Sequence, residues 1–180
     1  MQAISAPEPS EYAAYYGRYI ALVGGNDVIA ALERQPRETL ALPSSLREDQ
    51  GDYRYAAGKW SIKEMLGHVI DAERVFAYRA LRFARSDHTP LASFEQDDYV
   101  ASGGFAECSL KDLMEHFSAV RKSTLWLFRS FGPEAWMRLG IASENQVSVR
   151  AIAYIIAGHE LHHRRVLQEK YLAATQQASA

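Results

Sequence analysis

The sequence predicts an all-α fold, a four-helix bundle with an additional short helix at its N-terminus. Apolar residues recur at helical spacing through most of the 180 residues, and no segment shows the apolar–polar alternation typical of a β-strand. No linker, internal repeat or low-complexity block divides the chain. We therefore expect a single domain over residues 1–180, with the bundle at about 27–172, the extra helix within 1–26 and a frayed tail at 173–180.

Two helical segments are expected before the centre of the chain. The first begins at Pro9 or Ser10 and ends at Gly24-Gly25. One side of it, which we expect to pack on the bundle, carries Tyr12, Tyr16, Tyr19 and Val23. Asp27 is a predicted N-cap for the second segment, whose apolar pattern extends to Leu46. Pro36 and Pro43 lie inside that pattern, so we expect one kinked helix.

The central helix has the clearest beginning. Ser61 and Glu64 form a capping box, S-x-x-E, directly before an apolar run that predicts a helix to about Arg85. Its apolar arc is wide, so we expect it to be the most buried helix. Residues 86–108 contain a proline, two adjacent glycines and several polar residues, which predicts a long loop. Such a loop could lie across an open site.

The second half of the chain predicts two further long helices. Ser109 and Asp112 begin one, which ends at Gly132-Pro133 and is followed by a short helical turn at Trp136. Ser148 caps the last helix, in which Ile152, Ile155, His159, His163 and Val166 share one face.

Composition excludes several classes of protein. A hydrophobic fraction of 48% and a charged fraction of 23% exclude a largely disordered chain or a coiled-coil rod. With 20 Lys and Arg against 22 Asp and Glu, the chain lacks the basic surface of a nucleic-acid-binding protein. We found neither a window of about 18 apolar residues nor a signal peptide, so we expect no membrane association and a cytoplasmic location.

A single cysteine limits the kind of metal site that the chain can form. Cys108 alone permits neither an internal disulfide nor a cysteine-rich zinc site, so histidines and carboxylates would have to hold any metal. Its neighbours Glu107 and Ser109 supply no cation to activate the thiol, and we interpret Cys108 as a small loop or helix-cap residue.

The segment GHELHH, residues 158–163, is the sharpest chemical signal. His159 and His163 are four residues apart on one helix face, where they could share a metal ion, although such a pair can also be structural. His162 lies toward the edge of that face and is the weaker ligand candidate. The literal match to the H-E-x-x-H peptidase motif lacks its continuation, because Val166 and Glu169 stand where the extended motif needs Gly and His. A third ligand must therefore come from upstream.

His68, early in the central helix, is the upstream candidate. It lies roughly a right angle from the main apolar stripe of that helix, so periodicity alone does not direct it toward His159. Asp71 or Glu73 could orient a ligand at this level. His88 and His116 are expected to face solvent.

Two segments together resemble a known family. The run GKWSIKEMLGHVIDAERVFAYRALRF and the later run IIAGHELHHRRVLQEKYL resemble the DinB-like superfamily, which includes the YfiT-type metal-dependent proteins. The resemblance extends from about Asp27 to Leu172. It implies a four-helix bundle in which one His of the second bundle helix joins an H-x-x-x-H pair of the last helix to bind a divalent metal. Transferred to this chain, the implied ligands are His68, His159 and His163.

The resemblance leaves the reaction open, since the family includes transferases that join low-molecular-weight thiols to electrophiles. Our leading hypothesis is metal-dependent thiol transfer, with a thiol as a further cofactor and Arg79, Arg82 or Arg164 holding its carboxylate. The second is metal-dependent hydrolysis, with Glu160 or Glu73 as weak candidates for the base. The third is a non-catalytic, stress-related binding or scaffold protein.

The sequence predicts the ligand residues more specifically than it predicts the metal or the binding partners. Three His ligands suit zinc, nickel, iron, cobalt or manganese. We expect a small-molecule substrate or thiol as partner. The N-terminal tyrosines could form a homodimer interface if they are exposed, although ordinary packing against the bundle also explains them.

Overall fold

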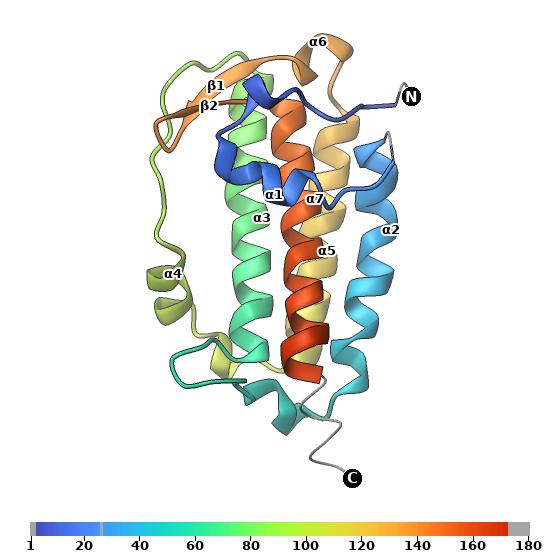
Figure 1. Cartoon of the computed structure of the whole chain (residues 1–180), viewed down its shortest axis with the longest axis vertical. Coiled ribbons are helices and arrows are strands. Elements are labelled where there is room, and N and C mark those ends of the chain that lie inside the picture. Colours follow the sequence, from blue (N-terminus) through green and yellow to red (C-terminus); the bar gives the residue numbers. More distant parts are fainter. Residues whose placement is uncertain (1–2, 26, 173–180) are drawn as a thin grey trace.

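The computed structural model describes residues 3–25 and 27–172. Four long helices run lengthwise side by side (Figure 1), namely α2 (Val28–Ala41), α3 (Ile62–Ala84), α5 (Leu110–Arg129) and α7 (Val149–Val166). Both α2 and α3 make their main contacts with α5 and α7, so they occupy diagonal corners of the bundle. The predicted four-helix bundle is confirmed.

Side chains predicted as N-caps begin all four long helices. A carboxylate oxygen of Asp27 accepts a hydrogen bond from the Ile29 N–H, 3.1 Å. Ser61 and Glu64 form the reciprocal capping box, in which each side chain accepts from the backbone N–H of the other. The hydroxyls of Ser109 and Ser148 accept from backbone N–H groups three residues later. Each cap satisfies a donor that has no partner within its own helix, which explains why these boundaries could be predicted.

The second predicted helix is shorter than expected. α2 accommodates Pro36 but ends at Ala41, and Pro43 begins a separate 3-10 turn, Pro43–Ser45. Proline has no N–H to continue the helical hydrogen bonds and fits the first position of a new turn. A further 3-10 turn, Glu48–Asp52, leads towards α3. The prediction of one kinked helix to Leu46 is therefore wrong beyond Ala41.

The N-terminal segment consists of three short pieces rather than one helix. Two 3-10 turns, Pro9–Glu11 and Ala14–Tyr16, precede α1 (Gly17–Ile20). The segment crosses α3 and α7 in the upper half of the bundle as drawn (Figure 1). Its predicted aromatic side does face the bundle, because Tyr19 is buried and Tyr12, Tyr16 and Val23 pack against the core.

Gly158 allows α1 to lie directly on α7. A Cβ atom at this position would lie 2.0 Å from the carbonyl oxygen of Tyr19, a backbone atom that cannot rotate away. We expect Gly158→Ala to destabilise the protein by about 1–3 kcal/mol, as overpacking does. Urea unfolding would measure this, with Gly24→Ala as the control because a Cβ there has nothing within 4 Å. Equal stability of the two variants would contradict the close approach.

Glu11 joins the N-terminal segment to the start of α7. Its carboxylate accepts hydrogen bonds from Ser148 Oγ, 2.6 Å, and Arg150 Nε, 2.8 Å. Partial burial raises the Glu11 pKa, but the hydrogen bonds from Arg150 and Ser148 outweigh it and lower the pKa from 4.5 to about 2. A carboxyl group whose pKa is lower in the folded state stabilises that state above its unfolded pKa.

We therefore expect Glu11→Gln to destabilise the protein at neutral pH and to have little effect near pH 2. The stabilisation by Glu11 should be complete above about pH 4.5 and disappear as the pH falls towards 2. Thermal unfolding of wild type and variant across this range would measure the difference. Glu107→Gln, on an exposed side chain, is the control. A difference that does not shrink in acid would refute the pairing.

Two features of the fold were not predicted. Strands β1 (Leu139–Ala142) and β2 (Asn145–Ser148) form an antiparallel hairpin, with Ala142 opposite Asn145. Ser143 and Glu144 turn the hairpin with φ of 51° and 62°, a conformation that Asn-Gly usually supplies. The predicted loop 86–108 contains α4 (Gln96–Ser102) and a 3-10 turn, Phe105–Glu107. The predicted turn at Trp136 is confirmed as α6 (Pro133–Trp136).

A polar layer interrupts the core about half way along the bundle. One apolar cluster surrounds the first half of α7 and the second half of α3, and the other surrounds the first halves of α3 and α5. Between them lie buried polar side chains, which we call the polar layer: His68, Glu73, Arg121, His159 and Glu160. Polar groups in a core are costly unless they are paired, so this level of the bundle is where a site is expected.

Beyond α7 the chain continues as a wider helical turn, Leu167–Leu172. Tyr171 is buried there and donates a hydrogen bond to the carbonyl of Trp60, 2.7 Å. The predicted tail at 173–180 lies outside the described residues. Within residues 3–25 and 27–172, no helix combines the length and the hydropathy needed to cross a bilayer.

Candidate metal centre

Three histidines from two helices converge within the bundle. Nε2 of His159 lies 3.1 Å from Nε2 of His68 and 3.2 Å from Nε2 of His163. One ring nitrogen from each of the three fits within a distance of 4.8 Å. α7 supplies His159 and His163 one turn apart, and α3 supplies His68 from the facing helix. In the described part of the chain this is the one cluster of three such side chains with metal-binding geometry.

Aromatic side chains hold these rings in place. Trp60 lies against His68 with ring centroids 4.7 Å apart. The ring of Tyr19 in α1 forms T-shaped contacts with the rings of His159 and His162, and the ring centroids lie 5.4 Å apart in both pairs. The close approach of α1 to Gly158 therefore places an aromatic ring directly on a histidine of the cluster. The rings are ordered by packing from outside the bundle as well as within it.

Burial keeps the three imidazoles neutral near neutral pH. Burial, with a smaller contribution from the neighbouring His162, lowers the pKa of His68 to about 4. Burial, followed by repulsion from other histidines, lowers the pKa values of His159 and His163 well below the usual 6.5. A neutral imidazole has a lone pair available, which is the form that binds a metal.

The other histidines lie outside this cluster. His88 is exposed, as predicted. His116 was expected to face solvent as well, but it is half-buried on α5 beside Asp71 and Arg74. His162 is half-buried, with its ring 5.1 Å from that of His163. Its place beside the cluster rather than in it agrees with its predicted position at the edge of the helix face.

The two carboxylates considered as bases are engaged by an arginine. Arg121 of α5 donates to both oxygens of Glu73, from Nε at 2.9 Å and from Nη2 at 2.8 Å. Its Nη1 lies 2.6 Å from a carboxylate oxygen of Glu160 and donates to the carbonyl of Leu32, 3.2 Å. Both pairs are almost completely buried. Neither Glu73 nor Glu160 belongs to the histidine cluster, so the structure gives both carboxylates a different neighbour.

Cavities open on both sides of the histidine cluster. His68 and His159 line one of about 230 Å³, and His162 and His163 line another of about 450 Å³. Gln96, at the start of α4, lines both. The segment 86–108, which the sequence analysis expected could lie across an open site, therefore lines cavities beside the histidines.

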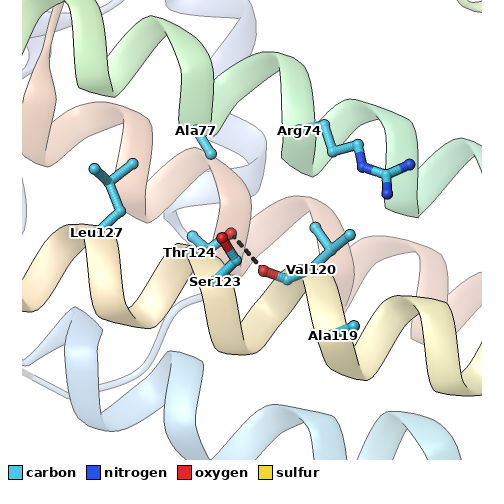
Figure 2. Close-up of a pocket in the computed structure, with 7 residues that line it drawn as sticks. All are labelled: Arg74, Ala77, Ala119, Val120, Ser123, Thr124 and Leu127. Carbon is cyan, nitrogen blue, oxygen red and sulfur yellow. Dashed lines mark hydrogen bonds between the residues drawn. The ribbon is translucent and has the colours of Figure 1, made fainter.

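A further hollow lies between α3 and α5, and its lining differs in chemistry from that of the cavities beside the histidine cluster. Figure 2 shows the residues that line it, among them Ala77, Ala119, Ser123 and Leu127. Its lining combines small and apolar side chains with the hydroxyls of Ser123 and Thr124 and one charged side chain, Arg74, and it includes no histidine. We interpret it as a shallow groove between helices rather than as a reactive site.

The structure distinguishes the three arginines named as anion-binding candidates. Arg82 is paired with Asp87 and also donates to Tyr78. Arg164 is paired with Glu38, 2.5 Å. Arg79 alone among the three lines a cavity together with His68 and His159.

Cys108 is partly buried at the end of the 3-10 turn 105–107, where its thiol lies 3.8 Å from the carbonyl of Gly104.

Sequence reasoning missed Arg121 and Trp60. Arg121 had a detectable signal, because it lies four residues after Phe117 and one after Val120, on the buried side of α5. A charged residue at such a position predicts a buried ion pair. Trp60 precedes the cap of α3, and its contact with His68 depends on the path of the chain before the helix.

A family model described as the DinB superfamily matches residues 31–167. A search of curated protein sequences returned no significant match. Among solved structures, YfiT from Bacillus subtilis is similar with a TM-score of 0.71 and 14% identity, over 92% of this chain and 91% of YfiT. YfiT is described as a probable metal-dependent hydrolase with an unusual four-helix bundle topology. A DinB-like protein from Bacillus subtilis, YjoA, is similar with a TM-score of 0.59 and 16% identity, over 85% of this chain and 92% of YjoA.

Proposed function

This chain belongs to the DinB superfamily, and from that premise we propose that it is a divalent-metal-dependent hydrolase of a small molecule. His68, His159 and His163 are the proposed metal ligands. The observation that carries the proposal is that Nε2 of the buried His159 lies close to Nε2 of both His68 and His163, with one ring nitrogen from each of the three within 4.8 Å of the others.

The distances between the imidazole nitrogens fit a shared ion. Two nitrogens bound to one ion at about 2.0–2.1 Å, with about 90–110° between the bonds, lie about 2.8–3.4 Å apart. The two observed separations, 3.1 and 3.2 Å, fall in this range. Hydrogen bonds explain them less well, because Nε2 of His159 has one hydrogen or one lone pair but faces two partners.

Three neutral histidines leave positions of an ion open, where it would act as a Lewis acid and lower the pKa of a coordinated water. The chain's own contribution is to hold the imidazoles neutral, to fix their rings with Trp60 and Tyr19, and to surround them with cavities of small-molecule size. We assign Glu73 and Glu160 to the ion pairs with Arg121 rather than to proton transfer.

We now prefer hydrolysis to thiol transfer as the proposed reaction, whereas the sequence alone led us to prefer thiol transfer. The described activity of YfiT supports hydrolysis, whereas neither the fold nor the comparisons give thiol transfer any support. The identity of the metal, a thiol cofactor, a homodimer, the exclusion of nucleic acid and a cytoplasmic location stay predictions. The non-catalytic binding protein is the alternative that the experiment below addresses.

The test is to strip the protein with a chelator, reload it with zinc, nickel, iron, cobalt or manganese, and assay each form. Carboxylic esters, amides and phosphoesters form the hydrolysis panel, and a panel of thiols with electrophiles runs in parallel. We expect hydrolysis of at least one class that appears on reloading and is absent from the stripped protein. Wild type that binds none of these metals, that binds metal but hydrolyses nothing in the panel, or that is active on the thiol panel alone, would overturn the proposal.

A further inference from the structure

Arg79 is a buried cation without a carboxylate partner. Its exposed fraction is 3%, and in residues 3–25 and 27–172 no carboxylate lies within ion-pair distance of its guanidinium. The other fully buried arginine, Arg121, is paired with two carboxylates. Burial lowers the Arg79 pKa, because removal from water disfavours the charged form. An unpaired buried charge of this kind requires an explanation.

The segment 86–108, predicted as a loop, and the unpredicted hairpin turn together hold this guanidinium. Its Nη2 donates to the carbonyl of Ala92, 2.8 Å, and to Ser143 Oγ, 3.1 Å. Ser143 lies in the hairpin turn with φ of 51°, a conformation that costs energy for a residue with a side chain. Leu91 is hydrogen-bonded to the same hairpin, so the loop and the turn form one support. These contacts, with a hydrogen bond between Arg79 and Tyr16, fix the guanidinium and still leave it with unused N–H donors.

The guanidinium faces the cavity of about 230 Å³ beside the histidine cluster. Aromatic rings form the walls, and Arg79 lies 5.6 Å from the centroid of Phe76 and 5.9 Å from that of Phe94. Tyr15, Tyr16 and Tyr19 complete the aromatic lining. His68 and His159 line the same cavity, so one small molecule can contact Arg79 and the proposed metal ligands together.

We propose that this cavity binds a small carboxylic acid as substrate, with its carboxylate on Arg79 and its apolar body between the aromatic rings. The reacting group then lies toward His68 and His159. A guanidinium matches the two oxygens of a carboxylate, and a single cation in the lining matches a single negative charge. This inference rests on the proposed function and adds a substrate class to it.

Glu95 is the carboxylate that lines the same cavity. It is exposed and forms no ion pair with Arg79 in the described part of the chain. Its charge at the mouth opposes an entering anion, so neutralising it should favour binding. Glu95 therefore offers a second, independent variant for the test.

The experiment measures binding of benzoate and of benzamide, its uncharged analogue, by calorimetry on chelator-treated protein. Without metal, any preference for benzoate reports on the protein side chains alone. We expect wild type to bind benzoate roughly tenfold or more tightly than benzamide. Arg79→Gln should lose this preference, and Arg79→Lys should regain part of it. Arg82→Gln, which changes an arginine outside the cavity, should behave as wild type.

Glu95→Gln keeps the inference testable if the Arg79 variants do not fold. We expect it to bind benzoate a few-fold more tightly and benzamide as wild type does. Equal binding of the two ligands by wild type, or an unchanged preference in folded Arg79→Gln, would overturn the inference. Absence of metal-dependent hydrolysis would instead overturn the proposed function, because this binding measurement requires neither metal nor turnover.

Discussion

Replacing Arg121 with methionine is expected to lower the free energy of unfolding by about 3–5 kcal/mol, because it leaves the buried carboxylates of Glu73 and Glu160 without their partner. Methionine replaces most of the volume of the arginine stem, so lost packing contributes little. Urea unfolding would measure the change. Lys122→Met, at the next and exposed position of α5, is the matched control.

The loss should also depend on pH in a characteristic way. Burial raises the pKa of Glu160 above its ordinary value, and removing Arg121 takes away the charge that opposes this effect. The folded variant then binds protons more readily than the unfolded chain, so its stability increases as the pH falls. We expect the deficit of Arg121→Met to be smaller at pH 5 than at pH 8. A deficit no larger than that of Lys122→Met, or one independent of pH, would contradict the buried ion pairs.

Replacing His159 with alanine is expected to reduce bound metal from about one ion per chain to near zero. His159 is the central ligand of the proposed set, because its Nε2 lies close to those of both other histidines. Hydrolysis should be lost with the metal. Elemental analysis of protein purified without a His-tag or chelator would measure occupancy, and His88→Ala, on an exposed loop, is the control.

A stability measurement separates loss of metal from loss of fold. Metal at about 100 times its dissociation constant should stabilise wild type by about 2.7 kcal/mol. His159→Ala should gain nothing from the same addition, while its stability without metal stays near that of stripped wild type or above it. Retention of metal by His159→Ala at the wild-type level would show that the three histidines are not the binding site.

The parts of the fold that depend on local sequence could be predicted. The caps at Asp27, Ser61, Ser109 and Ser148 each involve residues within three positions of one another, and all four were predicted correctly. The pairing of His159 with His163 follows in the same way from helical spacing. Local geometry determined these features, so a single sequence was sufficient.

Features that depend on distant segments could not be predicted from the residues alone. Periodicity did not direct His68 toward His159; it faces that residue because α3 is buried between α5 and α7, and the family resemblance supplied what the periodicity lacked. Glu73 and Glu160 were weak candidates for the base in the sequence analysis. Their actual neighbour, Arg121, is far from both in sequence, so the ion pairs could not be predicted from local spacing. The hairpin was missed because Ser143-Glu144 is not a usual turn pair.

The polar layer has a consequence for how the four helices can be aligned. An entirely apolar bundle could slide one helix along another by a turn and still bury similar surface. Here such a slip of α5 would move Arg121 away from Glu73 and Glu160, to a level where apolar side chains surround it. Slipped packings therefore bury an unpaired charge, whereas the native alignment pairs Arg121 with both carboxylates of the polar layer. The same alignment brings His68 opposite His159, so the ion pairs that fix the helices also assemble the histidine cluster.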